Sequence, residues 1–101
     1  MQTRTDKIEG PFRVTEDLTL HGMVTGDTTV ASGVFLNLHG LIGGNLRIEP
    51  EARVNLHGVV GGSVTNCGFV EVAGMIVGSL TDADGGESVV KPGAMIRNER
   101  R

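Results

Sequence analysis

Three histidines recur along the chain at a constant interval. His21, His39 and His57 are 18 residues apart, and each ends a hydrophobic-x-Leu-His phrase. If the interval reflects stacked structural repeats, neighbouring imidazoles lie about 5 Å apart. Imidazole binds zinc, copper and nickel, but parallel side chains do not converge on one ion, and Ala73 ends the row in the fourth repeat. We therefore expect polar residues that bond locally to the backbone and no metal site, and we leave any other role of this row open.

Two other segments contain residue types that bind metal ions or act in catalysis in other proteins. Residues 82–87, Asp-Ala-Asp-Gly-Gly-Glu, resemble a calcium loop but lack the full EF-hand pattern, so we expect an enlarged surface turn. Cys67 has no histidine in an equivalent position, and the glycines include no phosphate-binding Gly-x-x-x-x-Gly-Lys-Ser/Thr loop. The sequence therefore predicts no catalytic residue, no cofactor and no enzymatic activity.

Acidic residues gather at one position of the repeat. When the repeats are aligned, seven of the twelve acidic residues fall at the same corner: Glu16, Asp17, Glu49, Glu51, Asp82, Asp84 and Glu87. One interpretation is a solvated turn that keeps the protein in solution. The other is an acidic edge that steers and docks a basic partner.

Glycine pentads position all of these residues. Residues 22–26, 40–44, 58–62 and 74–78 share the form Gly-hydrophobic-hydrophobic-x-Gly, and their starts are 18, 18 and 16 residues apart. Such a period is typical of a solenoid, and alternating Val, Leu and Ile between the pentads favour strands. We expect an all-β fold: a single-stranded right-handed parallel β-helix of about five coils, with roughly 16–19 residues per coil. We also expect the glycines to sit in sharp turns, many with positive φ.

Composition excludes several classes of function. The net charge is −3, and the chain has no Trp, no Tyr and three Phe, so it lacks the basic stripe and stacking platform of a nucleic-acid binder. A single cysteine rules out an internal disulfide and fits a reducing cytoplasm. The absence of a run of about 18 apolar residues predicts no membrane span. We expect one cytoplasmic domain, residues 1–101, with repeats over about 8–96 and short capping tails.

The repeat resembles a known family. The pentads, the alternating strands and Pro92-Gly93-Ala94-Met95-Ile96 near the end are similar to the bactofilin, or polymer-forming, domain over roughly residues 8–96. The resemblance implies a right-handed β-helix whose copies assemble end to end into filaments without a nucleotide. In such a filament Phe12, Met95 and Ile96 would make the contacts between copies. Members commonly carry flexible tails, whereas the ends of this chain are short and charged.

Two hypotheses of function follow. In the first, the protein is a small immunity or inhibitor protein that neutralises a bacterial toxin, such as a basic nuclease, by covering its active surface with the acidic corner. This rests on a likeness in profile, because such proteins are small, acidic and poor in cysteine. In the second, it is a bactofilin-like cytoskeletal subunit that binds copies of itself. Charged ends favour a capped particle, and therefore the first hypothesis.

Overall fold

The chain folds into a solenoid made only of strands. The computed structural model describes residues 2–83 and 85–97, and these contain seventeen strands and no helix. Sheet A contains β1 (Gln2–Arg4), β4 (Leu18–Leu20), β7 (Phe35–Leu38), β10 (Arg53–Leu56), β13 (Phe69–Val72) and β16 (Glu87–Val90). Sheet B contains β2 (Lys7–Ile8), β5 (Met23–Val24), β8 (Leu41–Ile42), β11 (Val59–Val60), β14 (Met75–Ile76) and β17 (Met95–Ile96). Sheet C contains β3 (Phe12–Val14), β6 (Thr28–Val30), β9 (Leu46–Ile48), β12 (Val64–Asn66) and β15 (Leu80–Asp82).

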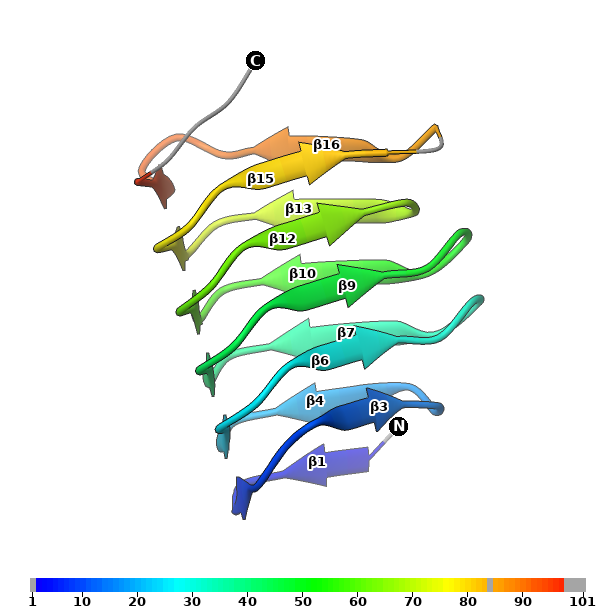
Figure 1. Cartoon of the computed structure of the whole chain (residues 1–101), viewed down its shortest axis with the longest axis vertical. Coiled ribbons are helices and arrows are strands. Elements are labelled where there is room, and N and C mark those ends of the chain that lie inside the picture. The colour runs from blue at the N-terminus through cyan, green and yellow to red at the C-terminus, as the bar shows by residue number, and fades with distance from the viewer. Residues whose placement is uncertain (1, 84, 98–101) are drawn as a thin grey trace.

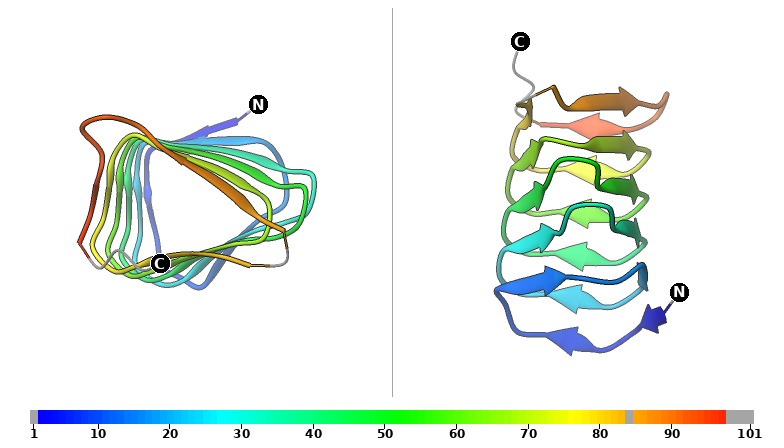
Figure 2. Two further views of the ribbon diagram at one scale, coloured as in Figure 1. Left: turned by 90° about the horizontal axis from the view of Figure 1, so that it is seen from above. Right: turned by 90° about the vertical axis from the view of Figure 1, so that its right-hand side faces the viewer.

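The winding is right-handed, as the sequence predicts. In Figure 1 the chain crosses the front along sheet C from left to right and returns behind along sheet A while it rises towards the C-terminus. Each strand pairs in parallel with its counterpart in the next coil, so that the three sheets enclose a triangular interior (Figure 2). Five coils of three strands are followed by a sixth coil that contains β16 and β17. The expected fold is therefore confirmed.

Aliphatic ladders fill the interior. Alternation along each strand turns every second residue inwards, and parallel register stacks equivalent residues. Leu20, Leu38, Leu56 and Val72 form one such ladder in sheet A, and all four are fully buried. The other ladders are Leu18, Leu36, Val54 and Val70 in sheet A, Val24, Ile42, Val60 and Ile76 in sheet B, and Val14, Val30 and Ile48 in sheet C. No single coil buries these side chains, so each coil depends on its neighbours.

The first coil begins earlier than the sequence indicates. Residues expected to cap the N-terminus form β1 and β2, which pair with β4 and β5. Arg4 takes the position that Leu20 has in the next coil, and Lys7 and Ile8 align with Met23 and Val24. The pattern is hidden because an end coil has a neighbour on one side only, and its inward positions therefore tolerate polar residues.

The pentad glycines are needed for close packing rather than for an unusual φ. Positive φ occurs, among the described glycines, at Gly33, Gly85 and Gly93, which lie outside the pentads, so the expectation of many positive-φ pentad glycines is wrong. A Cβ atom added to Gly40 would overlap the carbonyl oxygen of Gly22, and one added to Gly58 would overlap that of Gly40. Glycine at these positions therefore lets consecutive coils approach within hydrogen-bonding distance.

Side chains also bind consecutive coils at the corner between sheets B and C. The carboxylate of Asp27 accepts a hydrogen bond from the amide of Asn45 (2.9 Å), and the side-chain oxygen of Asn45 accepts one from the amide of Ser63 (2.8 Å). The hydroxyl oxygen of Ser63 then accepts one from the amide of Ser79 (3.2 Å). We call these four residues the B–C ladder. Asp27, Asn45 and Ser63 each satisfy a turn amide of the coil above, which fixes the coils in register.

Candidate functional site

The histidine row lies at the corner between sheets A and B. The rings of His21 and His39 stack with centroids 5.0 Å apart and planes 10° apart, and those of His39 and His57 stack at 5.0 Å and 7°. The main-chain amides of His39 and His57 donate to Leu20 and Leu38 of the coils below. The rings themselves are exposed and contact each other, so the expected local bonding involves the backbone amides and not the imidazoles.

Stacking gives the middle ring a distinct environment. Loss of hydration lowers the pKa of His39, and the neighbouring His57 and His21 lower it further by like-charge repulsion. Within residues 2–83 and 85–97, no group of three or more His, Cys, Asp or Glu side chains is arranged to hold a metal ion. The row is therefore an exposed, stacked strip in which the charged form of the middle ring, His39, is disfavoured.

Six of the seven predicted acidic residues are described, and they lie at the corner between sheets C and A. Asp84 lies outside the described residues. Three of the six have partners: the Glu49 carboxylate pairs with Arg13 (3.1 Å), Asp17 accepts from the Phe35 amide (3.0 Å), and Asp82 accepts from Asn66 (3.1 Å) and Ser88 (2.9 Å). The corner therefore does not present a uniform row of free carboxylates. The sequence alignment missed this because Arg13 reaches across two coils.

A groove interrupts this same corner at the fourth coil. The turns after β9 and β15 are each four residues long, at 49–52 and 83–86, but the turn after β12 consists only of Cys67 and Gly68. The short turn lies between Glu51 of the preceding turn and Gly85 of the following one, and the space between them is an open groove of about 360 Å³. Glu51 and Glu87 are among its lining residues. The 16-residue spacing from Val54 to Val70 signals the shortening, but it does not show that a groove results.

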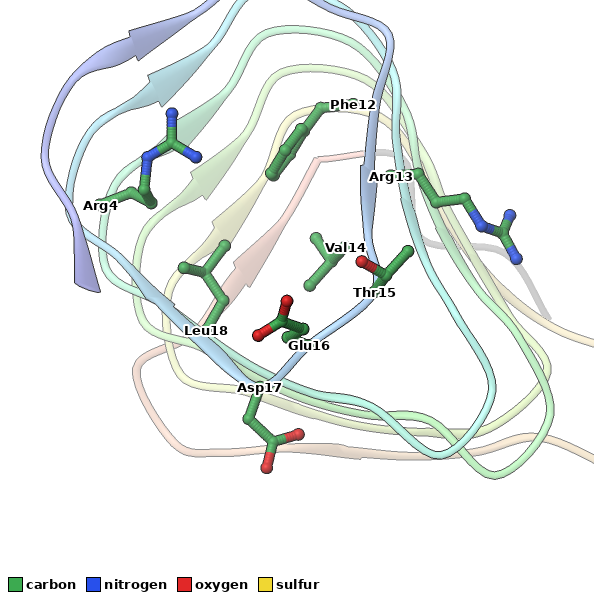
Figure 3. Close-up of a pocket in the computed structure, with 8 residues that line it drawn as sticks. All are labelled: Arg4, Phe12, Arg13, Val14, Thr15, Glu16, Asp17 and Leu18. Carbon is green, nitrogen blue, oxygen red and sulfur yellow. The ribbon is translucent and has the colours of Figure 1, made fainter. Parts of the chain in front are cut away.

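The N-terminal end of the solenoid is an open pocket. Sheet C begins with β3, and below it the interior opens into a cavity of about 170 Å³. Figure 3 shows Phe12, Val14 and Leu18 around this space inside the coil, with Arg4 on the side facing Phe12. The Arg4 guanidinium pairs with Asp6 (2.9 Å), and this hydrogen bond holds the pKa of the Asp6 carboxyl below its usual value. The pocket therefore has an apolar floor and a charged rim.

The C-terminal end exposes apolar side chains. Val89, Val90 and Met95 are the exposed large hydrophobic residues of the described chain, at 44%, 46% and 56%, and all three belong to the last coil. Val90 continues the Leu20 ladder, so it lies over the open interior, and the nearby Ile96 is half-buried. Phe12, Met95 and Ile96, expected to make contacts between copies, thus lie at the two ends of the solenoid.

A network of hydrogen bonds around the buried Asn66 lies between the hydrophobic core and the C-terminal end of the solenoid. Asn66 takes the position that Ile48 has in the coil below, and it is fully buried. Its side-chain amide donates to Asp82 (3.1 Å) and to the carbonyl of Glu87 (2.6 Å), and its oxygen accepts from the Gly68 amide (3.1 Å). The network satisfies a buried amide and joins the fourth, fifth and sixth coils near the groove.

No helix among the described residues is long and apolar enough to cross a membrane. In comparisons with known proteins, no family model, no curated protein and no solved structure matches this chain. The resemblance to bactofilins and the likeness to immunity proteins therefore stay predictions from sequence, and the right-handed β-solenoid is what the structure establishes.

Proposed function

We propose that this protein is a non-catalytic scaffold subunit that binds copies of itself through the two ends of its solenoid. The observation that carries the proposal is the last coil, where the exposed large hydrophobic residues of the described chain, Val89, Val90 and Met95, are gathered. An apolar patch at a sheet edge favours association, because it removes apolar surface from water and pairs free backbone groups.

The strand arrangement supports a head-to-tail contact. Within the described part of the chain, β16 and β17 have no neighbour on their outer side, and neither do β1 and β2 at the other end. If the first coil of another copy were placed on the last coil, β16 would pair with β1 and β17 with β2 in the parallel sense found throughout the solenoid. Val90 would then lie against Arg4, and Ile96 against Ile8, in the ladders that already fill the interior. This contact extends existing sheets and requires no new fold.

Light scattering after size-exclusion chromatography, over a concentration series and with electron microscopy of the same samples, tests the proposal. We expect the mass of the wild-type protein to grow with concentration. Val90→Lys places a second cation against Arg4 of the next copy and should weaken association by about 2 kcal/mol or more, since a buried charge that faces a like charge is costly. Asn55→Lys is the matched control, because Asn55 faces outwards from the same sheet in the middle of the stack. A wild-type protein that stays monomeric at every concentration contradicts the proposal.

Neutralisation of a basic toxin by the acidic corner remains the second candidate. The corner supports it because Glu16, Glu51 and Glu87 are exposed carboxylates on one edge of the molecule. Reversal of these three charges should then slow association with a basic nuclease domain, since steering depends on the sum of charges. Unchanged affinity would remove the corner from this role. The cytoplasmic location is likewise a prediction, supported by a single cysteine that is buried.

A further inference from the structure

The groove at the fourth coil results from a shortened turn, and the structure shows which residues form its walls and its floor. Because this turn is two residues shorter, Cys67 and Gly68 are recessed between Glu51 of the third-coil turn and Gly85 of the fifth-coil turn. Ala52 and Cys67 are buried beneath this space, so the floor is apolar and set by the stacking of the coils. The groove lies along the side of the solenoid, between sheets C and A, and away from both ends. Its role is therefore separable from self-assembly.

Carboxylates face the groove from both sides. Glu51 comes from the turn of the third coil and Glu87 from the first residue of β16, and both are exposed. Glu51 lies just before β10, and Glu87 begins β16, which is two strands further along sheet A and therefore about 10 Å away in the stacking direction. The one described cation of the lining, Arg53, has its guanidinium 5.2 Å from the centre of the Phe69 ring and is thus held against an aromatic face.

The backbone at Glu51 is strained where it lines the groove. Glu51 has φ 70° and is the one non-glycine residue with positive φ in the described chain. The corresponding turn residues of the second and fifth coils are Gly33 and Gly85, with φ 76° and 83°. A side chain is disfavoured in this conformation, yet here a glutamate takes the place of a glycine. The substitution costs stability and places a carboxylate at the rim of the groove.

We propose that this groove binds a lysine or arginine side chain from a basic, extended segment of a partner protein. A single cation seated between Glu51 and Glu87 would neutralise both carboxylates, and its aliphatic stem would cover the apolar floor made by Ala52, Cys67 and Gly68. The ring of Phe69 forms part of the wall and offers a further apolar contact. Charge complementarity selects a basic partner, and a recess in the surface accommodates a protruding side chain better than a flat surface.

Titration of the ¹⁵N-labelled protein with a tetralysine peptide, followed by amide chemical shifts, tests this proposal at low salt. We expect the shifts to concentrate at Gly68, Phe69 and Gly85. The double variant Glu51→Gln/Glu87→Gln should lower affinity about tenfold. The matched control is Glu16→Gln/Asp17→Asn, which removes two carboxylates from the same corner but in the first coil, and it should change affinity less than about twofold. Equal losses in the two double variants, or shifts spread over the whole corner, would show diffuse attraction and overturn the proposal.

The variant Glu51→Gly distinguishes the contribution of this side chain to tetralysine binding from its effect on the stability of the fold. Glycine restores the residue type of the equivalent turns, so the variant should melt several degrees higher than the wild type while it binds tetralysine about threefold more weakly. A higher melting temperature together with unchanged tetralysine affinity would refute the assignment of Glu51 to the groove. Neither result depends on the oligomeric state, which is read independently from the scattered mass.

Discussion

Replacement of Gly58 by alanine should be among the most damaging small substitutions in this protein. Gly58 follows His57 at the corner between sheets A and B, directly above Gly40 of the coil below. A methyl group on Gly58 would overlap the Gly40 carbonyl oxygen and would lie only 2.9 Å from the carbonyl carbons of Gly40 and His39. These are backbone atoms of a stacked coil, so they cannot rotate away, and the two coils must separate locally.

The magnitude follows from the hydrogen bonds that hold this corner. The amides of His57 and Gly58 donate to the Leu38 carbonyl at 2.8 and 3.0 Å, and the amide of Val59 donates to that of Gly40 at 3.0 Å. At about 1 kcal/mol net for each bond, their loss costs about 3 kcal/mol. Gly43→Ala is the matched control, since its added Cβ meets the Thr25 carbonyl oxygen at 3.2 Å and needs only a small shift. We expect it to cost less than about 1 kcal/mol.

Urea unfolding monitored by circular dichroism measures both variants. Gly58→Ala should lower the free energy of unfolding by about 3 kcal/mol, which corresponds to a fall in melting temperature of about 12 °C or more for a domain of this size. The reasoning fails if the two alanine variants differ by less than about 0.5 kcal/mol. Such a result would mean that the coils separate easily and that close approach is not the reason for glycine at this corner.

Three further perturbations probe other parts of the fold. Asn66→Ala should lower the free energy of unfolding by about 2 kcal/mol, because it leaves buried partners unsatisfied, and a loss below about 0.5 kcal/mol in urea unfolding would contradict this. Because the pKa of His39 is lowered in the folded state, the protein should hold its full stability above the unfolded value of about 6.5 and lose part of it as the pH falls through that value. The urea midpoint should therefore fall between pH 7.5 and 5, and His39→Gln should reduce this dependence; a midpoint that rises on acidification would refute it. Arg13→Ala, which removes an exposed ion pair with Glu49, should cost less than about 1 kcal/mol in the same assay, and a loss of 2 kcal/mol would show that the pair fixes the corner.

The interior of the solenoid could be predicted from the sequence because it follows two simple periods. Leu20, Leu38 and Leu56 recur every 18 residues, and the alternation of apolar and polar residues within each strand indicates which residues face inwards. These signals are strong in the middle of the stack, where every coil has two neighbours. They fade at the first coil, where Arg4 takes the position of a leucine because one side of it faces water.

The surface could be predicted only in part. The alignment brought the acidic residues to one corner, but the partners of Glu49 and Asp82 depend on side chains that cross coils, and no one-dimensional alignment shows them. The groove was missed for a related reason: a two-residue deletion near Cys67 becomes a recess only when longer turns lie on both sides. Likewise, the sequence shows glycine at Gly33 and at Gly58 but not that the first needs a positive φ and the second needs space.

The B–C ladder and the parallel sheets have a mechanical consequence. The hydrogen bonds between coils run along the solenoid axis, and each coil is held by the coils directly above and below it. A force that pulls the two chain ends apart would therefore load one terminal coil at a time and peel the stack in order, at low force. Coils of 16 or 18 residues would each release roughly 50–60 Å of chain, so single-molecule extension should advance in steps of that size. Under force the protein would therefore unfold coil by coil from its ends and not in a single cooperative event.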